Sequence, residues 1–188
     1  MTAWWQMYRK AFTAQECADL TAHFMTYPVK DAAIGYGATP VVNHQKRRSK
    51  VRWIPRNDPQ LITFFAKIRD MAEAVNIKAF HFDIRLFHEV QFTEYSAEDE
   101  GHFDWHIDNN WKAKEANVRK LSMVMQLSDP AEYEGGKLEI ENDPLPANTF
   151  TDQGDVIFFP SFNRHRVTPV TRGIRYSLVT WLKGPQFR

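Results

Sequence analysis

The apolar residues between positions 17 and 25 are spaced as on one face of a helix. Thr13 precedes them and is followed three residues later by Glu16, the arrangement of a capping box at a helix start. We predict a helix from about residue 14 to 26, ended before Pro28 because a residue that precedes proline disfavours the helical conformation. Its apolar face consists of Cys17, Leu20, Phe24 and Met25.

A second helical pattern begins near residue 57. Asn57 and Asp58 can cap a helix, and Pro59 suits the first helical turn. We predict an amphipathic helix from there to about residue 75. Its apolar face consists of Leu61, Ile62, Phe65, Ile68, Met71, Ala72 and Val75.

From Phe80 onward the apolar residues alternate with polar ones, the period of a half-buried strand. Short strand candidates then continue to the C-terminus, with Gly-containing turn signals between several of them. This pattern predicts a mainly β protein with N-terminal helices (α+β), in which the strands form a sandwich or jelly roll and the helices cover one sheet. The alternation is Phe80, Phe82, Ile84, Leu86, and the further candidates are 88–95, 103–107, 121–128, 137–141, 156–160, 165–170 and 176–182.

Length and composition fit one globular domain. The chain has 188 residues, of which 43% are hydrophobic and 25% charged, enough to bury a core without cross-links. Cys17 is the single cysteine, which excludes an internal disulfide and fits a reducing compartment. The N-terminus lacks the features of a signal peptide, and no segment reaches about 18 consecutive apolar residues. We therefore expect a cytoplasmic protein with no membrane segment.

The net charge is +1, so no global field favours nucleic acid or acidic membranes. Locally, six cations surround Trp53 between Lys46 and Arg56. Two interpretations of this basic segment stay open. It is either a solvated loop that enters an edge strand or a rim that contacts substrate.

Three residues form a candidate metal site. His106 and Asp108 lie two residues apart at the end of a predicted strand, so their side chains project from one face. His165 follows the apolar segment 156–159 and can supply a third ligand. Two imidazoles and one carboxylate leave three positions open on an octahedral ion, which is typical of Fe(II) enzymes that bind a co-substrate and O2 together.

The sequence around His165 adds context to this weak three-residue signal. Gly154-Asp155-Val156-Ile157-Phe158-Phe159-Pro160 precedes it, and Arg175-Tyr176-Ser177-Leu178-Val179-Thr180-Trp181 follows it. In this order the motifs resemble the 2-oxoglutarate- and Fe(II)-dependent dioxygenase superfamily, specifically its prolyl-4-hydroxylase-like branch. The resemblance covers about residues 87–183. It implies a double-stranded β-helix core (jelly roll, cupin-like) over 79–188, with 1–78 as a helical support and substrate-loop region of the same domain.

The same resemblance implies cofactors and their ligands. Fe(II) would be held by His106, Asp108 and His165, and 2-oxoglutarate and O2 would be co-substrates, with ascorbate as a candidate reductant. Arg175 would pair with the distal carboxylate of 2-oxoglutarate, since a guanidinium binds a carboxylate through two hydrogen bonds. Arg172 competes for this role, but it precedes Gly173 in a predicted turn. The two further candidate contacts to 2-oxoglutarate are Tyr95 and Gln126.

The implied activity is hydroxylation of a C–H bond coupled to decarboxylation of 2-oxoglutarate to succinate. A prolyl or other peptidyl residue, or a small molecule, is the expected substrate, and Trp111 and Arg166 are candidate contacts to it. One alternative is a nucleic-acid-demethylating dioxygenase, motivated by the basic segment. Another is a non-catalytic jelly-roll binding module, against which the complete ligand set with Arg175 argues. The fold alone does not select the target.

Overall fold

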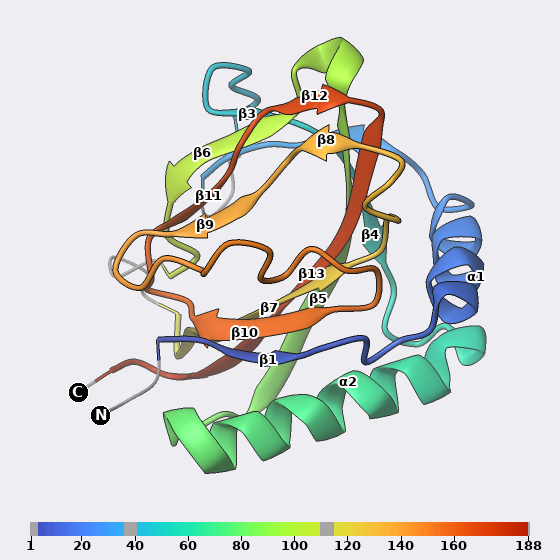
Figure 1. Ribbon diagram of the computed structural model, residues 1–188. Helices are drawn as coiled ribbons and strands as arrows, with labels where there is room; N and C mark the ends of the chain where they lie inside the picture. Colours follow the sequence, from blue (N-terminus) through green and yellow to red (C-terminus); the bar gives the residue numbers. More distant parts are fainter. Residues whose placement is uncertain (1–3, 36–40, 110–114, 188) are drawn as a thin grey trace.

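Two β-sheets face each other in the computed structural model, which describes residues 4–35, 41–109 and 115–187 (Figure 1). Every neighbouring pair of strands in the larger sheet is antiparallel. In spatial order, its strands are β1 (Gln6–Tyr8), β10 (Val156–Pro160), β7 (Asn117–Gln126), β13 (Ile174–Pro185), β5 (Leu86–Ser96), β4 (Lys50–Ile54) and β2 (Lys30–Asp31). The smaller sheet contains β3 (Arg47–Arg48), β6 (His102–His106), β11 (His165–Val167) and β9 (Leu138–Ile140), and a separate pair contains β12 (Val170–Arg172) and β8 (Glu134–Gly135).

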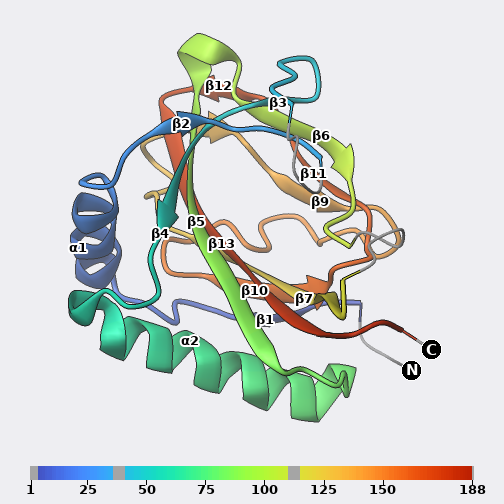
Figure 2. The ribbon, with the colours of Figure 1, turned by 180° about the vertical axis from the view of Figure 1, so that it is seen from behind.

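Two helices, α1 (Ala14–Phe24) and α2 (Ile62–Val75), pack on the face of the larger sheet that points away from the smaller one (Figures 1 and 2). The predicted capping box of α1 is confirmed: the Thr13 hydroxyl accepts from the Glu16 backbone N–H, and the Glu16 carboxylate accepts from the Thr13 N–H. A 3-10 turn, Pro59–Leu61, leads into α2. Among the described helices, none has the length and apolar character needed to span a membrane.

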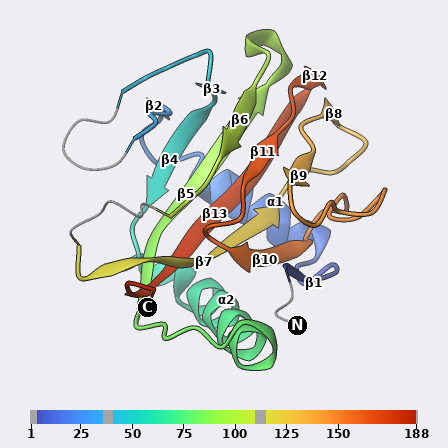
Figure 3. The same ribbon diagram turned by 90° about the vertical axis from the view of Figure 1, so that its left-hand side faces the viewer.

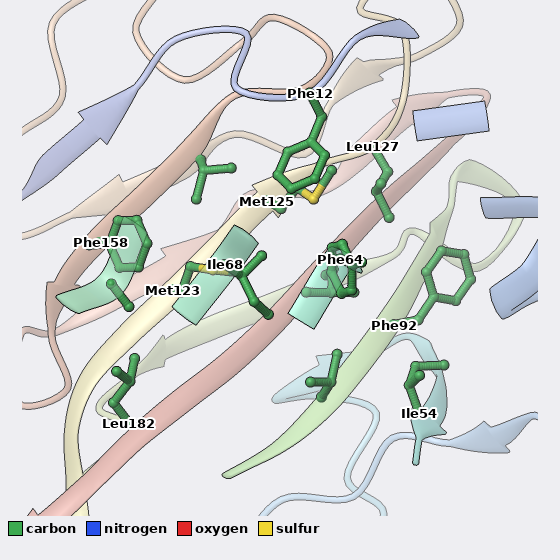
Figure 4. Close-up of a cluster of buried hydrophobic side chains, with 14 of the residues drawn as sticks. Phe12, Ile54, Phe64, Ile68, Phe92, Met123, Met125, Leu127, Phe158 and Leu182 are labelled. Carbon is green, nitrogen blue, oxygen red and sulfur yellow. The ribbon is translucent and has the colours of Figure 1, made fainter. Parts of the chain in front are cut away.

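The main core lies between these helices and the larger sheet (Figure 4). Met123 and Met125 of β7 point toward the helices, as period-two alternation requires. Phe64 and Ile68 of α2 pack against them in the same cluster. Burying one such side chain contributes about 1.5–3 kcal/mol, so this layer fixes the sheet in place.

The intervening residues of the same strands face the smaller sheet. Val124 of β7 and Phe159 of β10 join Leu138 and Ile140 of β9 in a second apolar cluster. In Figure 3 β7, β13 and β5 lie next to one another in the larger sheet, which carries Val124 and Phe159, while β9 lies in the smaller sheet. The inner faces of the two sheets thus enclose the space in which the candidate site lies.

The prediction of a strand that begins at Phe80 is wrong for residues 80–85. Asn76–Phe80 forms a π-helical turn, residues 81–85 belong to no strand, and β5 begins at Leu86. The Asn76 side chain donates to the Phe82 carbonyl and accepts from the Phe82 N–H, both at 2.9 Å. It therefore occupies the backbone groups that a strand would pair with a neighbour.

Residues before 79 do more than support the core with helices. They contribute β1, β2 and β4 to the larger sheet and β3 to the smaller one. The basic segment is therefore largely strand, and β4 is not an edge strand because β2 lies outside it. Arg47 and Arg52 of this segment are buried, so the solvated-loop interpretation is wrong for both.

Candidate active site

The three candidate metal ligands meet where the smaller sheet faces the larger one. His106 on β6 and His165 on β11 are direct cross-strand partners, and their ring centroids lie 4.2 Å apart. Nε2 of His106 is 3.8 Å from Oδ1 of Asp108, and Nε2 of His165 is 3.6 Å from Oδ2. One potential ligand atom from each residue lies within 4.8 Å of the others, a spacing that suits a single ion.

Asp108 reaches this position from beyond the strand. β6 ends at His106, so the same-face argument from the sequence does not apply to Asp108 itself. Instead, the backbone N–H groups of Asp108 and Asn109 both donate to the Ser161 carbonyl at 2.9 Å. The carboxylate is oriented further by the Ser122 hydroxyl, which donates to Oδ2 at 2.7 Å.

Both imidazoles present Nε2 to the centre of the group. Nδ1 of His106 lies 2.8 Å from the Asp104 carbonyl, and Nδ1 of His165 lies 2.9 Å from the Asn163 carbonyl. A carbonyl oxygen can only accept, so Nδ1 carries the proton on each ring and Nε2 keeps its lone pair. This is the tautomer that a metal ligand needs.

Electrostatics favour the same protonation states. Burial lowers the pKa of His106, the neighbouring His165 lowers it further, and Arg47 adds to the effect, so the ring stays neutral. Burial by itself raises the pKa of Asp108, but His165, His106, Arg119 and the Ser122 hydroxyl together outweigh it, and the net shift of the pKa is downward. A neutral His106 ring beside an ionised Asp108 carboxylate forms part of a donor set ready to bind a cation.

A cavity of about 480 Å³ opens onto the three residues. Arg175 of β13 lies on its wall with only 2% of its surface exposed. Nε of Arg175 donates to Oε1 of Gln126 at 3.0 Å, whereas the buried Nη1 has no hydrogen-bond partner among the described residues. A buried unpaired donor is costly, and a carboxylate in the cavity would satisfy it.

Of the other three candidate contacts to a co-substrate, only Tyr95 lines the cavity. Arg172 is exposed and pairs with Glu134 at 2.8 Å, away from the cavity. Gln126 does not line it, because this fully buried side chain lies behind Arg175 and also donates to the Tyr133 hydroxyl at 2.7 Å.

Gly136 belongs to the Gly135-Gly136 pair, one of the Gly-containing turn signals of the sequence, and it also shapes the site. Its φ of +58° is one that side-chain-bearing residues rarely adopt, and an added Cβ would lie 2.8 Å from Cδ of Arg175. The absence of a side chain at Gly136 therefore leaves room for Arg175. The Gly-Gly pair in the sequence was the available signal.

Two residues, Trp111 and Arg166, are predicted from the sequence to contact the substrate. Trp111 lies outside the described residues. Arg166 alternates with His165 along β11, and its guanidinium lies over the ring of Trp105 and bonds Glu139 at 2.6 Å. This ion pair accounts for its position without a substrate.

Half of the chain matches a known family. Residues 90–183 match the sequence model described as the 2OG-Fe(II) oxygenase superfamily, and the chain therefore belongs to this superfamily. A PKHD-type hydroxylase of Pseudomonas fluorescens is 38% identical over 88 residues, which cover 45% of this chain and 39% of the relative. The matched part thus spans only about two fifths of the length of that curated relative.

Solved structures share the whole fold at lower identity. A prolyl-4-hydroxylase of Pseudomonas putida superposes with a TM-score of 0.74 and 21% identity, covering 96% of this chain and 93% of that one. A prolyl hydroxylase of Trichoplax adhaerens, solved with a hypoxia inducible factor peptide fragment, gives a TM-score of 0.73 and 15% identity, covering 95% and 83%. These similarities confirm the predicted jelly-roll core with helices on one sheet.

The residues present fit the iron and 2-oxoglutarate that the superfamily uses. Two imidazoles and a carboxylate match the donors preferred by Fe(II), and they leave one side of the ion open to the cavity. The unpaired Nη1 of Arg175, in the wall of the same cavity, suits a dicarboxylate. Both groups therefore have a place in this chain.

Proposed function

We propose that the protein is an Fe(II)- and 2-oxoglutarate-dependent oxygenase that hydroxylates a C–H bond. The observation that carries this proposal is the placement of His106, Asp108 and His165 in one cavity with the buried, partly unpaired guanidinium of Arg175. A metal-binding group alone would also suit a non-catalytic jelly roll. The anion-binding arginine favours an enzyme with a carboxylate co-substrate.

Each residue has a distinct task in the proposed enzyme. His106, Asp108 and His165 hold the metal, and the Ser122 hydroxyl fixes the orientation of the carboxylate. Arg175 binds the distal carboxylate of 2-oxoglutarate, and Tyr95 contacts the same molecule from the opposite strand of the β5–β13 pair.

The metal and co-substrate, when bound, supply the oxidising chemistry, with succinate and CO2 as co-products. The chain itself supplies a partly apolar pocket that limits water. Leu138, Val167 and Val179 form part of its apolar wall. The main contributions of the protein are therefore to position the metal and co-substrate and to exclude water.

For the substrate we propose a prolyl or other peptidyl side chain, or a small molecule. Proline hydroxylation by two proteins of the same fold supports a peptidyl target. A nucleic acid is less favoured, because three cations of the basic segment are already in ion pairs: Lys46 with Asp104, Arg48 with Glu100 and Arg52 with Glu94. Phosphate binding draws on such cations, so fewer remain for it.

The proposal is tested by anaerobic titration of the protein with Fe(II) and then 2-oxoglutarate. We expect a weak metal-to-ligand charge-transfer band in the visible region, and succinate production once O2 is admitted. R175M should lose the band while retaining the metal, whereas R172M, which removes an exposed paired arginine, should leave it unchanged. H165A should abolish metal binding and turnover. A folded wild-type protein that binds iron but shows neither band nor succinate would favour the non-catalytic module instead.

A further inference from the structure

Arg47 is a buried cation in the active-site cavity for which the proposed function has no use. It lies on β3 with 7% of its surface exposed, and its side chain lines the same cavity as Arg175. Its Nη2 donates to Oε1 of Gln91 at 2.7 Å, and its Nε donates to Oγ of Ser49 at 2.8 Å. Gln91 and Ser49 are both neutral, and so is the Tyr95 hydroxyl, with which the Arg47 side chain also forms a hydrogen bond.

Three other cations of the basic segment are each paired with a carboxylate. Lys46, Arg48 and Arg52 each have a carboxylate oxygen within 3.2 Å. No such ion pair of Arg47 occurs among the described residues. A buried charge is expensive unless an opposite charge accompanies it. The carboxylate of Asp108 attracts Arg47 only from beyond ion-pair distance and belongs to the proposed metal site, so Arg47 has no direct carboxylate partner of its own among the described residues.

Arg47 also lies close to the proposed metal. Its guanidinium carbon is 4.5 Å from the centroid of the Phe103 ring, and this ring stacks on His106 with the centroids 3.5 Å apart. The proposed metal ligand His106 and Arg47 therefore both contact the same aromatic ring. A group held by Arg47 would be a near neighbour of the reacting centre.

The net charge of the cavity also favours an anionic substrate. Its described lining contains five cations and three carboxylates, one of which is Asp108. A bound Fe(II) ion and a bound 2-oxoglutarate dianion cancel each other, so the loaded cavity keeps a net positive charge. The cations are Lys30, Lys46, Arg47, Arg119 and Arg175.

We propose that Arg47, oriented by Gln91 and Ser49, is a specificity residue that binds a carboxylate of the substrate inside the cavity. The substrate is then an acid whose oxidised C–H bond lies a short distance from its carboxylate. That carboxylate belongs to a small free acid or to an acidic side chain of a peptide. This inference rests on the proposed function, because it assigns a substrate class to the same site.

The test is calorimetric binding to the anaerobic protein loaded with Fe(II) and 2-oxoglutarate. Two matched pairs of probes differ only in the carboxylate: N-acetyl-L-proline with its amide, and acetyl-Pro-Asp-amide with acetyl-Pro-Asn-amide. The wild-type protein should bind the acid of at least one pair on the order of 10- to 100-fold more tightly than its neutral partner. The pair that shows the preference identifies the source of the carboxylate.

Two variants assign the preference to Arg47. R47M keeps an apolar stem but removes the charge, and it should bind acid and amide alike. K46Q is the matched control, because Lys46 lines the same cavity but is already paired with Asp104 at 2.7 Å. It should keep the preference for the acid.

The proposal is overturned if the wild-type protein shows no preference in either pair, including the case in which no probe binds, or if the preference survives in R47M. It is also overturned if R47M loses 2-oxoglutarate as R175M does, because Arg47 would then belong to the co-substrate site. The charge-transfer band tests the proposed function separately. If that band does not form, the same calorimetric titrations on the protein with Fe(II) alone still report the acid preference.

Discussion

At the scale of single residues, the side chains that hydrogen-bond to the proposed metal ligands should affect the affinity for Fe(II). The Ser122 hydroxyl donates to Asp108 and lies 2.9 Å from the hydroxyl of Ser161. S122A should weaken Fe(II) binding by roughly 10- to 100-fold, since ligand carboxylates depend on such partners for orientation. Metal titration of the apoprotein measures this. S161A, one hydrogen bond further away, should have a smaller effect, and equal affinity in S122A and wild type would contradict the prediction.

Gln126 should act through Arg175. Its carbonyl oxygen accepts from Nε of Arg175, and its amide donates to Tyr133. Q126L should therefore raise the KM for 2-oxoglutarate about tenfold, because the guanidinium loses a buried partner that orients it. The kcat at saturation should change little. Y133F removes only the more distant hydrogen bond and should raise the KM less; an unchanged KM in Q126L would show that Arg175 needs no such support.

How far the sequence predicts the site depends on how local each signal is. His106, Asp108, His165 and Arg175 stand in short motifs at the ends or starts of strands, so their types and spacing could be read directly. Arg47 could not be found in this way. Its burial depends on the pairing of β3 with β6 and on the approach of Gln91 from the opposite sheet, which local sequence does not encode.

At the scale of elements, α1 depends on its cap. Thr13 and Glu16 close the capping box, and Glu16 also bonds Lys67 of α2 at 3.0 Å. T13A should lower the free energy of unfolding by about 1 kcal/mol, because it leaves an N-terminal N–H of the helix without its acceptor. Urea denaturation gives this value. T13S retains the hydroxyl and should restore most of the stability; a T13A protein as stable as wild type would refute the role of the cap.

The contact between α1 and the turn that precedes α2 should make the free energy of unfolding depend on pH in the acidic range. Asp58 accepts from the Tyr27 hydroxyl and lies 2.6 Å from Nε2 of His23, and these partners lower its pKa to about 2. The unfolded chain, with the ordinary pKa of 3.8, binds the proton first as the pH falls. The stabilisation is therefore complete above pH 3.8 and is lost toward pH 2.

D58N tests this dependence, since asparagine can still cap the turn at Gln60 but does not titrate. Between pH 5 and pH 3 the wild-type protein should lose more free energy of unfolding than D58N. Parallel losses in the two proteins would place the acid sensitivity elsewhere.

The elements also show where periodicity misleads. Strands such as β10 coincide with their predicted residues, because an apolar run between turn signals has few alternatives. The alternation that begins at Phe80 had a competing explanation. The rings of Phe80 and Phe82 stack with their centroids 5.9 Å apart, and the Asn76 side chain hydrogen-bonds to the backbone N–H and carbonyl of Phe82. Apolar side chains two residues apart therefore pack together here without forming a strand.

At the scale of the whole molecule, the N-terminal and C-terminal parts share one core. Phe24 of α1 and Phe64 of α2 pack with Phe92 of β5, with ring centroids of Phe24 within 5.9 Å of both. β4 pairs with β5 along five residues, and β3 carries Arg47 over the cavity. We therefore propose that residues 1–188 form one domain and that 79–188 is not an independent core.

The fragment 79–188 should accordingly fail to fold alone. Without the helices, the outer face of the larger sheet would expose side chains such as Phe92, Met123 and Phe158, each of which is fully buried in the chain. Losing about 1.5–3 kcal/mol for each of several such residues exceeds a typical total stability of about 5–15 kcal/mol. Near-ultraviolet circular dichroism and amide chemical-shift dispersion measure the outcome against 1–188. A fragment with dispersed amide signals and a cooperative unfolding transition would show that the sheets hold together without residues 1–78, and the one-domain proposal would then be wrong.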